Sequence, residues 1–224
     1  MDIVVSILRH TERKSKMKLQ DNNYAEITGF ITNDFEYSHR IMGENFYTAT
    51  LKSERTSGVF DYIQFTVSDR LIEITDLSDM YVRIKGQYRS FNKHNGDGKS
   101  KLVLSLFVKE IEEIETEEFP YNRITLNGFI CKQPTYRKTT LGREISDVLL
   151  AVQRKYGKSD YIPCIAWGRN ANFVGSLSIG SQIKVSGRIQ SRDYQKKLDD
   201  GTIVERTCNE VSISSVELVE ECED

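Results

Sequence analysis

The sequence has 224 residues, of which 38% are apolar and 29% are charged, and its formal net charge is −2. These proportions are typical of an ordinary soluble protein and exclude a disordered or membrane-spanning chain. The apolar stretch from Ile3 to Leu8 is too short for a transmembrane helix and follows no basic region. We therefore expect a cytoplasmic protein with no membrane partner.

Cysteine and histidine patterns argue against catalysis and metal binding. The four cysteines form no Cys-x-x-Cys pair, and residues 21–118 contain none of them, so neither a disulfide framework nor a zinc site is supported. His10, His39 and His94 lie far apart, and no nucleophile motif or glycine-rich phosphate loop is present. The sequence predicts no enzyme, no catalytic residue, no metal and no cofactor.

Charge is distributed unevenly along the chain. Lys and Arg against Asp and Glu number 5 against 2 in residues 1–20, 11 against 18 in 21–118, 15 against 8 in 119–216, and none against 5 in 217–224. A protein that binds a polyanion needs a local basic surface. Of the two blocks large enough to be a domain, only residues 119–216 have an excess of basic residues, so they are the candidate for such binding.

Gly-Phe-Ile occurs at residues 29–31 and again at 128–130, 99 residues later. From Gly29 to Ile63, eleven of 35 positions are identical at that spacing, several times the rate expected by chance. With a two-residue shift the match continues from Tyr81 into Gln182. The chain therefore contains a duplication of about 100 residues, a normal size for a small domain.

The first repeat is predicted at 21–118 and begins after an extension at 1–20, for which Met17 is an alternative start. Its strands alternate, with Ile63, Phe65, Val67, Val82, Ile84 and Tyr88 facing the core. Val82, Ile84 and Tyr88 alternate with basic and aromatic residues that face outward. These are Arg83, Lys85, Arg89 and Phe91. Turns are predicted around Gly58 and at Asn95–Gly98, and the Glu-rich segment Glu110–Asn122 is predicted to end the last strand and serve as the linker.

The second repeat is predicted at 119–216, before an acidic tail at 217–224. Ile162, Cys164 and Ala166 face the core, and Tyr161, Ile165 and Trp167 face outward. Further on, Ile183, Val185 and Ile189 alternate with Lys184, Arg188, Gln190, Arg192 and Tyr194. Turns are predicted around Gly157 and at Asp199–Gly201, and a short helix within Arg169–Gly180. Pro163 indicates an open barrel edge or a bulge.

Each repeat thus contains roughly five strands and one short helix. This count, with glycine at tight bends, is typical of a small Greek-key barrel of the OB type. We predict an all-β protein made of two tandem OB-fold barrels.

The second repeat resembles the DNA-binding domain of the bacterial single-stranded DNA-binding protein (SSB) family from Asn122 to Glu217. The stretches that carry the resemblance are LNGFICKQPTYR, DYIPCIAWGR and GSQIKVSGRIQSRDY. The resemblance implies that single-stranded DNA wraps over the barrel, with bases stacked on aromatic side chains and phosphates on cations. Exposed aromatic rings beside a basic groove would accept any base on physical grounds as well.

Carried over to this chain, the implied stacking residues are Tyr156, Tyr161, Trp167 and Tyr194, with Tyr62 as the first-repeat equivalent of Tyr161. The implied phosphate contacts are Arg137, Lys138, Arg143, Arg154, Lys155, Lys158, Arg169, Lys184, Arg188 and Arg192. The first repeat has Ser57 and Lys93 where the second has Tyr156 and Tyr194. Together with its acidity, this predicts that the first repeat alone binds DNA poorly.

The resemblance also implies a homodimer containing four barrels, and replication or repair proteins as further candidate partners. The tail is acidic but lacks the apolar tip by which family members dock onto such partners. Three alternatives stay open: a protein-interaction module of a primosome or replication-restart complex, a single-stranded RNA-binding barrel, and, least favoured, a cryptic nuclease.

Overall fold

The computed structural model of the chain describes residues 22–74, 80–94, 100–114, 120–197 and 201–219. The predicted N-terminal extension, the turn at Asn95–Gly98, the middle of the linker, Asp199, and the end of the tail lie outside these residues. The side chains of His94, Tyr156, Lys196 and Lys197 also lie outside them.

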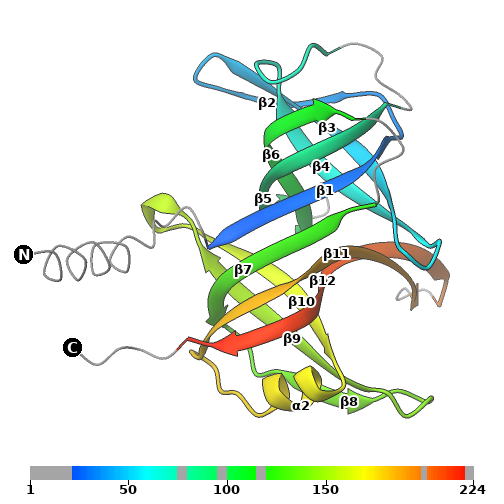
Figure 1. Cartoon of the computed structure of the whole chain (residues 1–224), viewed down its shortest axis with the longest axis vertical. Helices are drawn as coiled ribbons and strands as arrows, with labels where there is room; N and C mark the ends of the chain where they lie inside the picture. The colour runs from blue at the N-terminus through cyan, green and yellow to red at the C-terminus, as the bar shows by residue number, and fades with distance from the viewer. Residues whose placement is uncertain (1–21, 75–79, 95–99, 115–119, 198–200, 220–224) are drawn as a thin grey trace, which may run out of the picture.

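Within the described residues, twelve strands form one continuous sheet that is folded into two barrels (Figure 1). The first barrel contains β1 (Asn23–Ile31), β2 (Glu36–Ile41), β3 (Glu44–Glu54), β4 (Phe60–Ser68), β5 (Tyr81–His94) and β6 (Ser100–Glu113). The second contains β7 (Asn122–Ile130), β8 (Thr135–Lys138), β9 (Glu144–Gln153), β10 (Ser159–Trp167), β11 (Gln182–Lys197) and β12 (Ile203–Leu218).

Both barrels have OB topology. β1 pairs with β3 and with β5, and β7 pairs with β9 and with β11, which closes each barrel. The parallel pairs β4–β6 and β10–β12 complete the Greek key. The predicted fold is confirmed, with one more strand per barrel than expected, because the short strands β2 and β8 pair with β3 and β9.

The repeated Gly-Phe-Ile marks the corner at which each barrel closes. A Cβ atom at Gly29 would lie 2.5 Å from the Lys52 carbonyl oxygen, and one at Gly128 would lie 2.7 Å from that of Ala151. Real Cβ atoms do not approach oxygen this closely, so the strand can turn from one neighbour to the other only at glycine. The two repeats therefore share glycine at the position where close approach of the backbones excludes a side chain.

Alternation predicted the buried faces well, with two exceptions. Ile63, Tyr88, Ile162 and the other predicted core side chains are buried. Ile165 and Gln190 were predicted to face solvent, yet their side chains are only 4% and 6% exposed. Alternation identifies the face of a strand, but not whether neighbouring side chains cover that face.

The helix predictions need correction. The helix α2 (Arg169–Gly175) lies within the predicted range Arg169–Gly180, and its buried residues are Ala171 and Val174. The turn Lys155–Gly157 is a short 3-10 helix. Among the described residues of the first barrel there is no helix, so the prediction of one helix per barrel holds only for the second.

Pro163 lies inside β10, where a proline is unusual. Its antiparallel partner, Leu149, uses its carbonyl to accept the Cys131 N–H, so Leu149 forms its hydrogen bond toward β7 and not toward Pro163. The parallel pairing with β12 begins only at Cys164. The missing proline N–H is therefore at a position where the sheet needs no donor.

The two barrels are joined by antiparallel pairing of β1 with β7, which lie side by side in Figure 1. Ala25 pairs with Ile124, its own equivalent in the second repeat. Two hydrogen bonds flank this pair at matching positions, from the Thr28 N–H to the Tyr121 carbonyl at 2.8 Å and from the Asn127 N–H to the Asn22 carbonyl at 2.7 Å. A pseudo-two-fold axis therefore passes through the Ala25–Ile124 pair.

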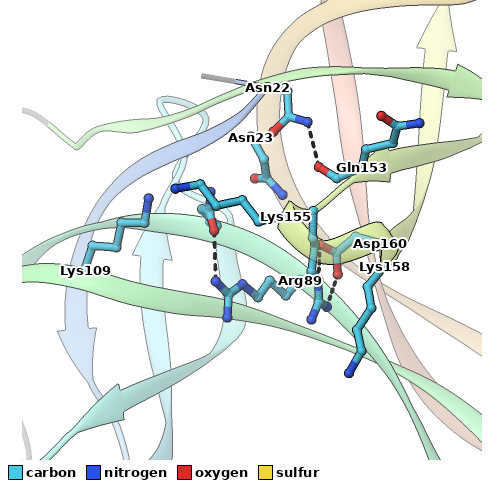
Figure 2. Close-up of a pocket in the computed structure, with 10 residues that line it drawn as sticks. Asn22, Asn23, Arg89, Lys109, Gln153, Lys155, Lys158 and Asp160 are labelled. Carbon is cyan, nitrogen blue, oxygen red and sulfur yellow. Dashed lines mark hydrogen bonds and ion pairs between the residues drawn. The ribbon is translucent and has the colours of Figure 1, made fainter. Parts of the chain in front are cut away.

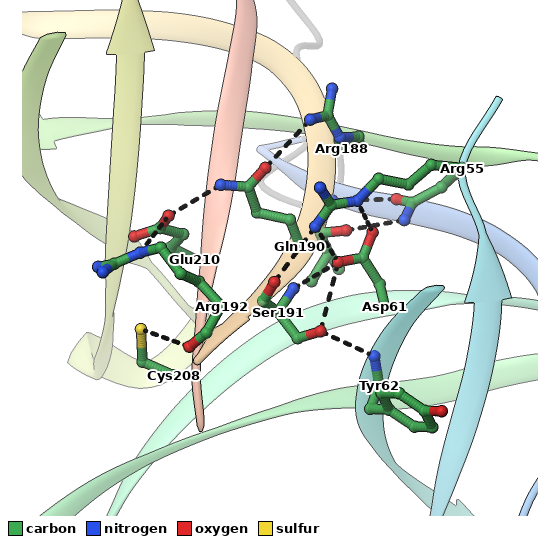
Figure 3. A network of polar contacts seen from close by, with 11 residues as sticks. Arg55, Asp61, Tyr62, Arg188, Gln190, Ser191, Arg192, Cys208 and Glu210 are labelled. Carbon is green, nitrogen blue, oxygen red and sulfur yellow. Dashed lines mark hydrogen bonds and ion pairs between the residues drawn. The ribbon is translucent and has the colours of Figure 1, made fainter. Parts of the chain in front are cut away.

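Two equivalent Arg–Asp ion pairs stabilise the junction, and each binds a serine of the other barrel. These serines lie on the long strands β5 and β11; we call the paired strands β5–β6 and β11–β12 the arms of the two barrels. The buried Asp61 carboxylate accepts from both Arg55 and the Ser191 N–H, the latter at 2.6 Å, and Arg55 donates to the Ser191 carbonyl (Figure 3). Across the pseudo-axis, Asp160 accepts from Arg154 and the Ser90 N–H, and Arg154 donates to the Ser90 carbonyl. We call these the two serine clamps.

Removing one clamp carboxylate should destabilise the protein. Asp160→Ala leaves Arg154 without its partner and the buried Ser90 N–H without an acceptor, at an expected cost of about 3 kcal/mol. Asp147→Ala is the matched control, because the Arg137–Asp147 pair is largely exposed and should contribute at most about 1 kcal/mol. Urea unfolding measures both, and equal losses for the two variants would contradict the clamp.

Candidate nucleic-acid interface

Two predicted stacking residues lie at opposite ends of the outer face of β10. Tyr161 is 47% exposed and Trp167 is 39% exposed. Trp167 lies six positions after Tyr161 along the strand, a span of about 20 Å. The two exposed rings on this face of β10 are thus far enough apart to stack with different bases of one DNA strand.

The other predicted stacking residues lie near the junction. Tyr62 and Tyr161 are equivalent, and each donates its N–H to a clamp serine, Ser191 at 3.0 Å and Ser90 at 2.7 Å. Tyr194 is exposed on β11, three residues beyond Ser191. Tyr156 has its backbone in the 3-10 turn, and its side chain is outside the described part of the structure.

Most of the predicted phosphate contacts are exposed. Arg137 pairs with Asp147 at 3.0 Å and Lys138 with Glu144 at 3.6 Å, both at the surface near β8. A phosphate could replace either carboxylate at small cost, because exposed pairs are weak. The other exposed cations of the predicted set are Arg143, Lys155, Lys158, Arg169, Lys184, Arg188 and Arg192.

On β11, Arg188 and Arg192 border a polar network (Figure 3). Glu210 accepts from Gln190 at 2.8 Å and from Arg192 at 3.4 Å. Burial lowers the pKa of Arg192, but Glu210, together with Cys208 and Asp147, outweighs burial and the pKa is raised overall. Burial, followed by repulsion from Arg55, lowers the pKa of Arg188, and the Asp61 carboxylate opposes this shift.

Arg154 differs from the other predicted phosphate contacts. Its guanidinium is held by Asp160 and the Ser90 carbonyl, so it belongs to a serine clamp. Sequence reasoning missed the clamps, although a signal was present: Arg55, Asp61 and Ser90 recur as Arg154, Asp160 and Ser191.

Sequence reasoning placed Arg89 on a basic outward face of the first barrel, but it did not predict that basic residues of both barrels line one cavity. Arg89 and Lys109 join Arg154, Lys155 and Lys158 of the second barrel around one cavity of about 490 Å³ (Figure 2). Counting charge by repeat concealed this, because the acidic total of the first repeat says nothing about individual positions.

The described residues contain no cluster of three or more His, Cys, Asp or Glu side chains able to hold a metal ion. The helices found in the same part of the chain are all too short or too polar to cross a membrane.

Two OB barrels joined across a pseudo-axis, with aromatic and basic side chains on the outer strands, define the class of fold. The wild-type single-stranded DNA binding protein from Thermus aquaticus has the same fold, with a TM-score of 0.69 and 19% identity over 90% of this chain and 95% of that one.

The profile of the Single-strand binding protein family matches residues 121–219. The single-stranded DNA-binding protein of Clostridium tetani is 36% identical over 106 residues, which are 44% of this chain and 70% of that protein. Single-stranded DNA-binding protein A of Bacillus subtilis is 33% identical over 44% of this chain and 59% of its own length. The chain belongs to the Single-strand binding protein family.

Proposed function

We propose that this protein binds single-stranded DNA without sequence preference and protects it during replication, recombination or repair. The observation that carries the proposal is the pair of exposed rings, Tyr161 and Trp167, on one strand of a basic barrel. Family membership and the names of the relatives support DNA binding over the protein-interaction and RNA-binding alternatives.

The proposed mechanism combines stacking with phosphate contacts. Every base has a flat face, so an exposed ring accepts any of them, at about 1–3 kcal/mol for each stacked base. Surface cations such as Lys184 and Arg169 hold the backbone and release counterions, which makes affinity fall as salt rises. Neither interaction makes or breaks a covalent bond, so the proposed role is binding and not catalysis.

Trp167→Ala should weaken binding of an oligothymidine by about 1–3 kcal/mol, because one base loses its stacking partner. The fold should be unaffected, since Trp167 lies outside the buried core. As the single Trp of the chain, it should also report binding in the parent protein through quenching of its fluorescence.

Two controls accompany this variant. Phe173 on α2 is also 39% exposed, so Phe173→Ala removes an equally accessible ring and should leave affinity unchanged. Ile162 is fully buried, so Ile162→Ala should cost stability by about 2–5 kcal/mol. Unchanged emission on adding DNA, together with full affinity of Trp167→Ala, would refute stacking at this position.

We also propose that two chains form a homodimer with four barrels. The support is the family resemblance, in which chains with two barrels commonly pair. Light scattering should then give about twice the chain mass of 25.8 kDa. A mass equal to one chain across the micromolar range would exclude the dimer.

A further inference from the structure

The cavity at the barrel junction is shared equally between the two repeats. Five of its lining residues come from the first barrel and five from the second. In Figure 2, Lys109 of the first barrel and Lys155 of the second extend toward one another from opposite sides. We call this space the junction cleft; its lining residues are Asn22, Asn23, Gln87, Arg89, Lys109, Gln153, Arg154, Lys155, Lys158 and Asp160.

The junction cleft is strongly basic. Asp160 is the one carboxylate among these ten residues, and its two oxygens are already occupied by Arg154 and the Ser90 N–H. Four further cationic side chains line the space: Arg89, Lys109, Lys155 and Lys158. Holding like charges together disfavours the unliganded state, and an anion would relieve it.

The environment of Arg89 is a second indication that the junction cleft binds an anion. Its guanidinium lies 3.7 Å from the centre of the Phe107 ring and donates to Gln87 at 3.0 Å, while its buried Nε has no hydrogen-bond acceptor among the described residues. Burial, followed by repulsion from Arg154, lowers its pKa. Arg89 is therefore a fixed cation with donor capacity to spare.

The pseudo-axis generates an equivalent position on the opposite side of the junction, where there are fewer basic residues: Gln190 stands for Arg89, although Arg188 stands for Gln87. At the repeat spacing, Thr56 and Val59 stand for Lys155 and Lys158, and Glu54 stands for Gln153. The contacts of Gly86 with Phe107 and of Gly187 with Ser212 align Lys109 with Ser214. The Arg–Asp clamp is present on both sides, so the three lysines serve something other than the junction.

The junction cleft also adjoins the proposed DNA path. Tyr161 directly follows Asp160 and is hydrogen bonded to Ser90. Next to Ser90 on the same arm is Phe91, which is exposed. A strand leaving Tyr161 toward the first barrel would thus meet the cleft cations first and an accessible ring next.

We propose that the junction cleft binds backbone phosphates of single-stranded DNA and guides one strand from the second barrel onto the first, on the lysine-rich side of the pseudo-axis. This rests on the proposed function. It gives the acidic first barrel a part in binding, through Arg89 and Lys109.

The test uses the full chain and an oligothymidine of about 35 nucleotides, longer than the roughly 4–16 nucleotides covered by one OB fold. Lys155→Thr/Lys158→Val replaces two cleft lysines with the residue types found at the equivalent positions, Thr56 and Val59, on the opposite side of the junction. It should make the slope of log affinity against log salt less negative by about 1.4, at about 0.7 for each lost phosphate contact. Lys109→Ser should make the slope less negative by about 0.7, because the proposed DNA strand reaches the first barrel and loses one phosphate contact there.

The matched control is Arg40→Val/Lys132→Thr, which removes two exposed cations outside the cleft and should leave the slope unchanged. Equal slopes for the control and the cleft variants, with tight binding by the parent, would overturn this inference alone. A parent protein that does not bind oligothymidine would overturn the proposed function, and the inference with it. Thermal melts that match the parent confirm that the variants are folded.

Discussion

The antiparallel pairing of β1 with β7 is the contact on which the rest of the structure depends. It consumes one sheet edge of each barrel and sets the pseudo-axis through Ala25 and Ile124. Once the barrels are placed in this way, each arm reaches the other barrel, where Asp61 and Asp160 hold Ser191 and Ser90. The exposed tyrosines beside these serines and the junction cleft exist only because the barrels are joined in this geometry.

The backbone of the chain is nearly symmetric, whereas its surface chemistry is not. The Arg–Asp pairs, which hold the barrels together, and the corner glycines, which let each barrel close, are identical in both repeats. Several functional positions have diverged: Ser68 stands at the position equivalent to Trp167, and the cleft lysines have neutral counterparts. Identity at the serine clamps and barrel corners with divergence at the surface is what we expect when two copies of one domain keep the same fold and clamps and only one copy keeps the full DNA-binding face.

Much of this architecture could be predicted from the sequence, because alternation and turn glycines are local signals. The repeat, the OB barrels, the buried face of β10 and the exposure of Tyr161 and Trp167 all followed from them. The clamp role of Arg154, the burial of Ile165 and the position of Lys109 in the cavity were not predicted, although the recurrence of the clamp residues in both repeats was a signal for the first. Each depends on a contact between residues far apart in the chain, and charge counted over a whole repeat conceals where single side chains meet.

The central claim is that single-stranded DNA lies on the aromatic and basic face of the second barrel. Photocrosslinking tests it most directly, since 5-iododeoxyuridine in an oligonucleotide reacts preferentially with a stacked aromatic side chain. Mass spectrometry of the crosslinked peptides should identify Tyr161, Trp167 and Tyr194 as the main attachment points. Crosslinks confined to exposed first-barrel rings remote from the junction, such as Tyr37, would contradict the account.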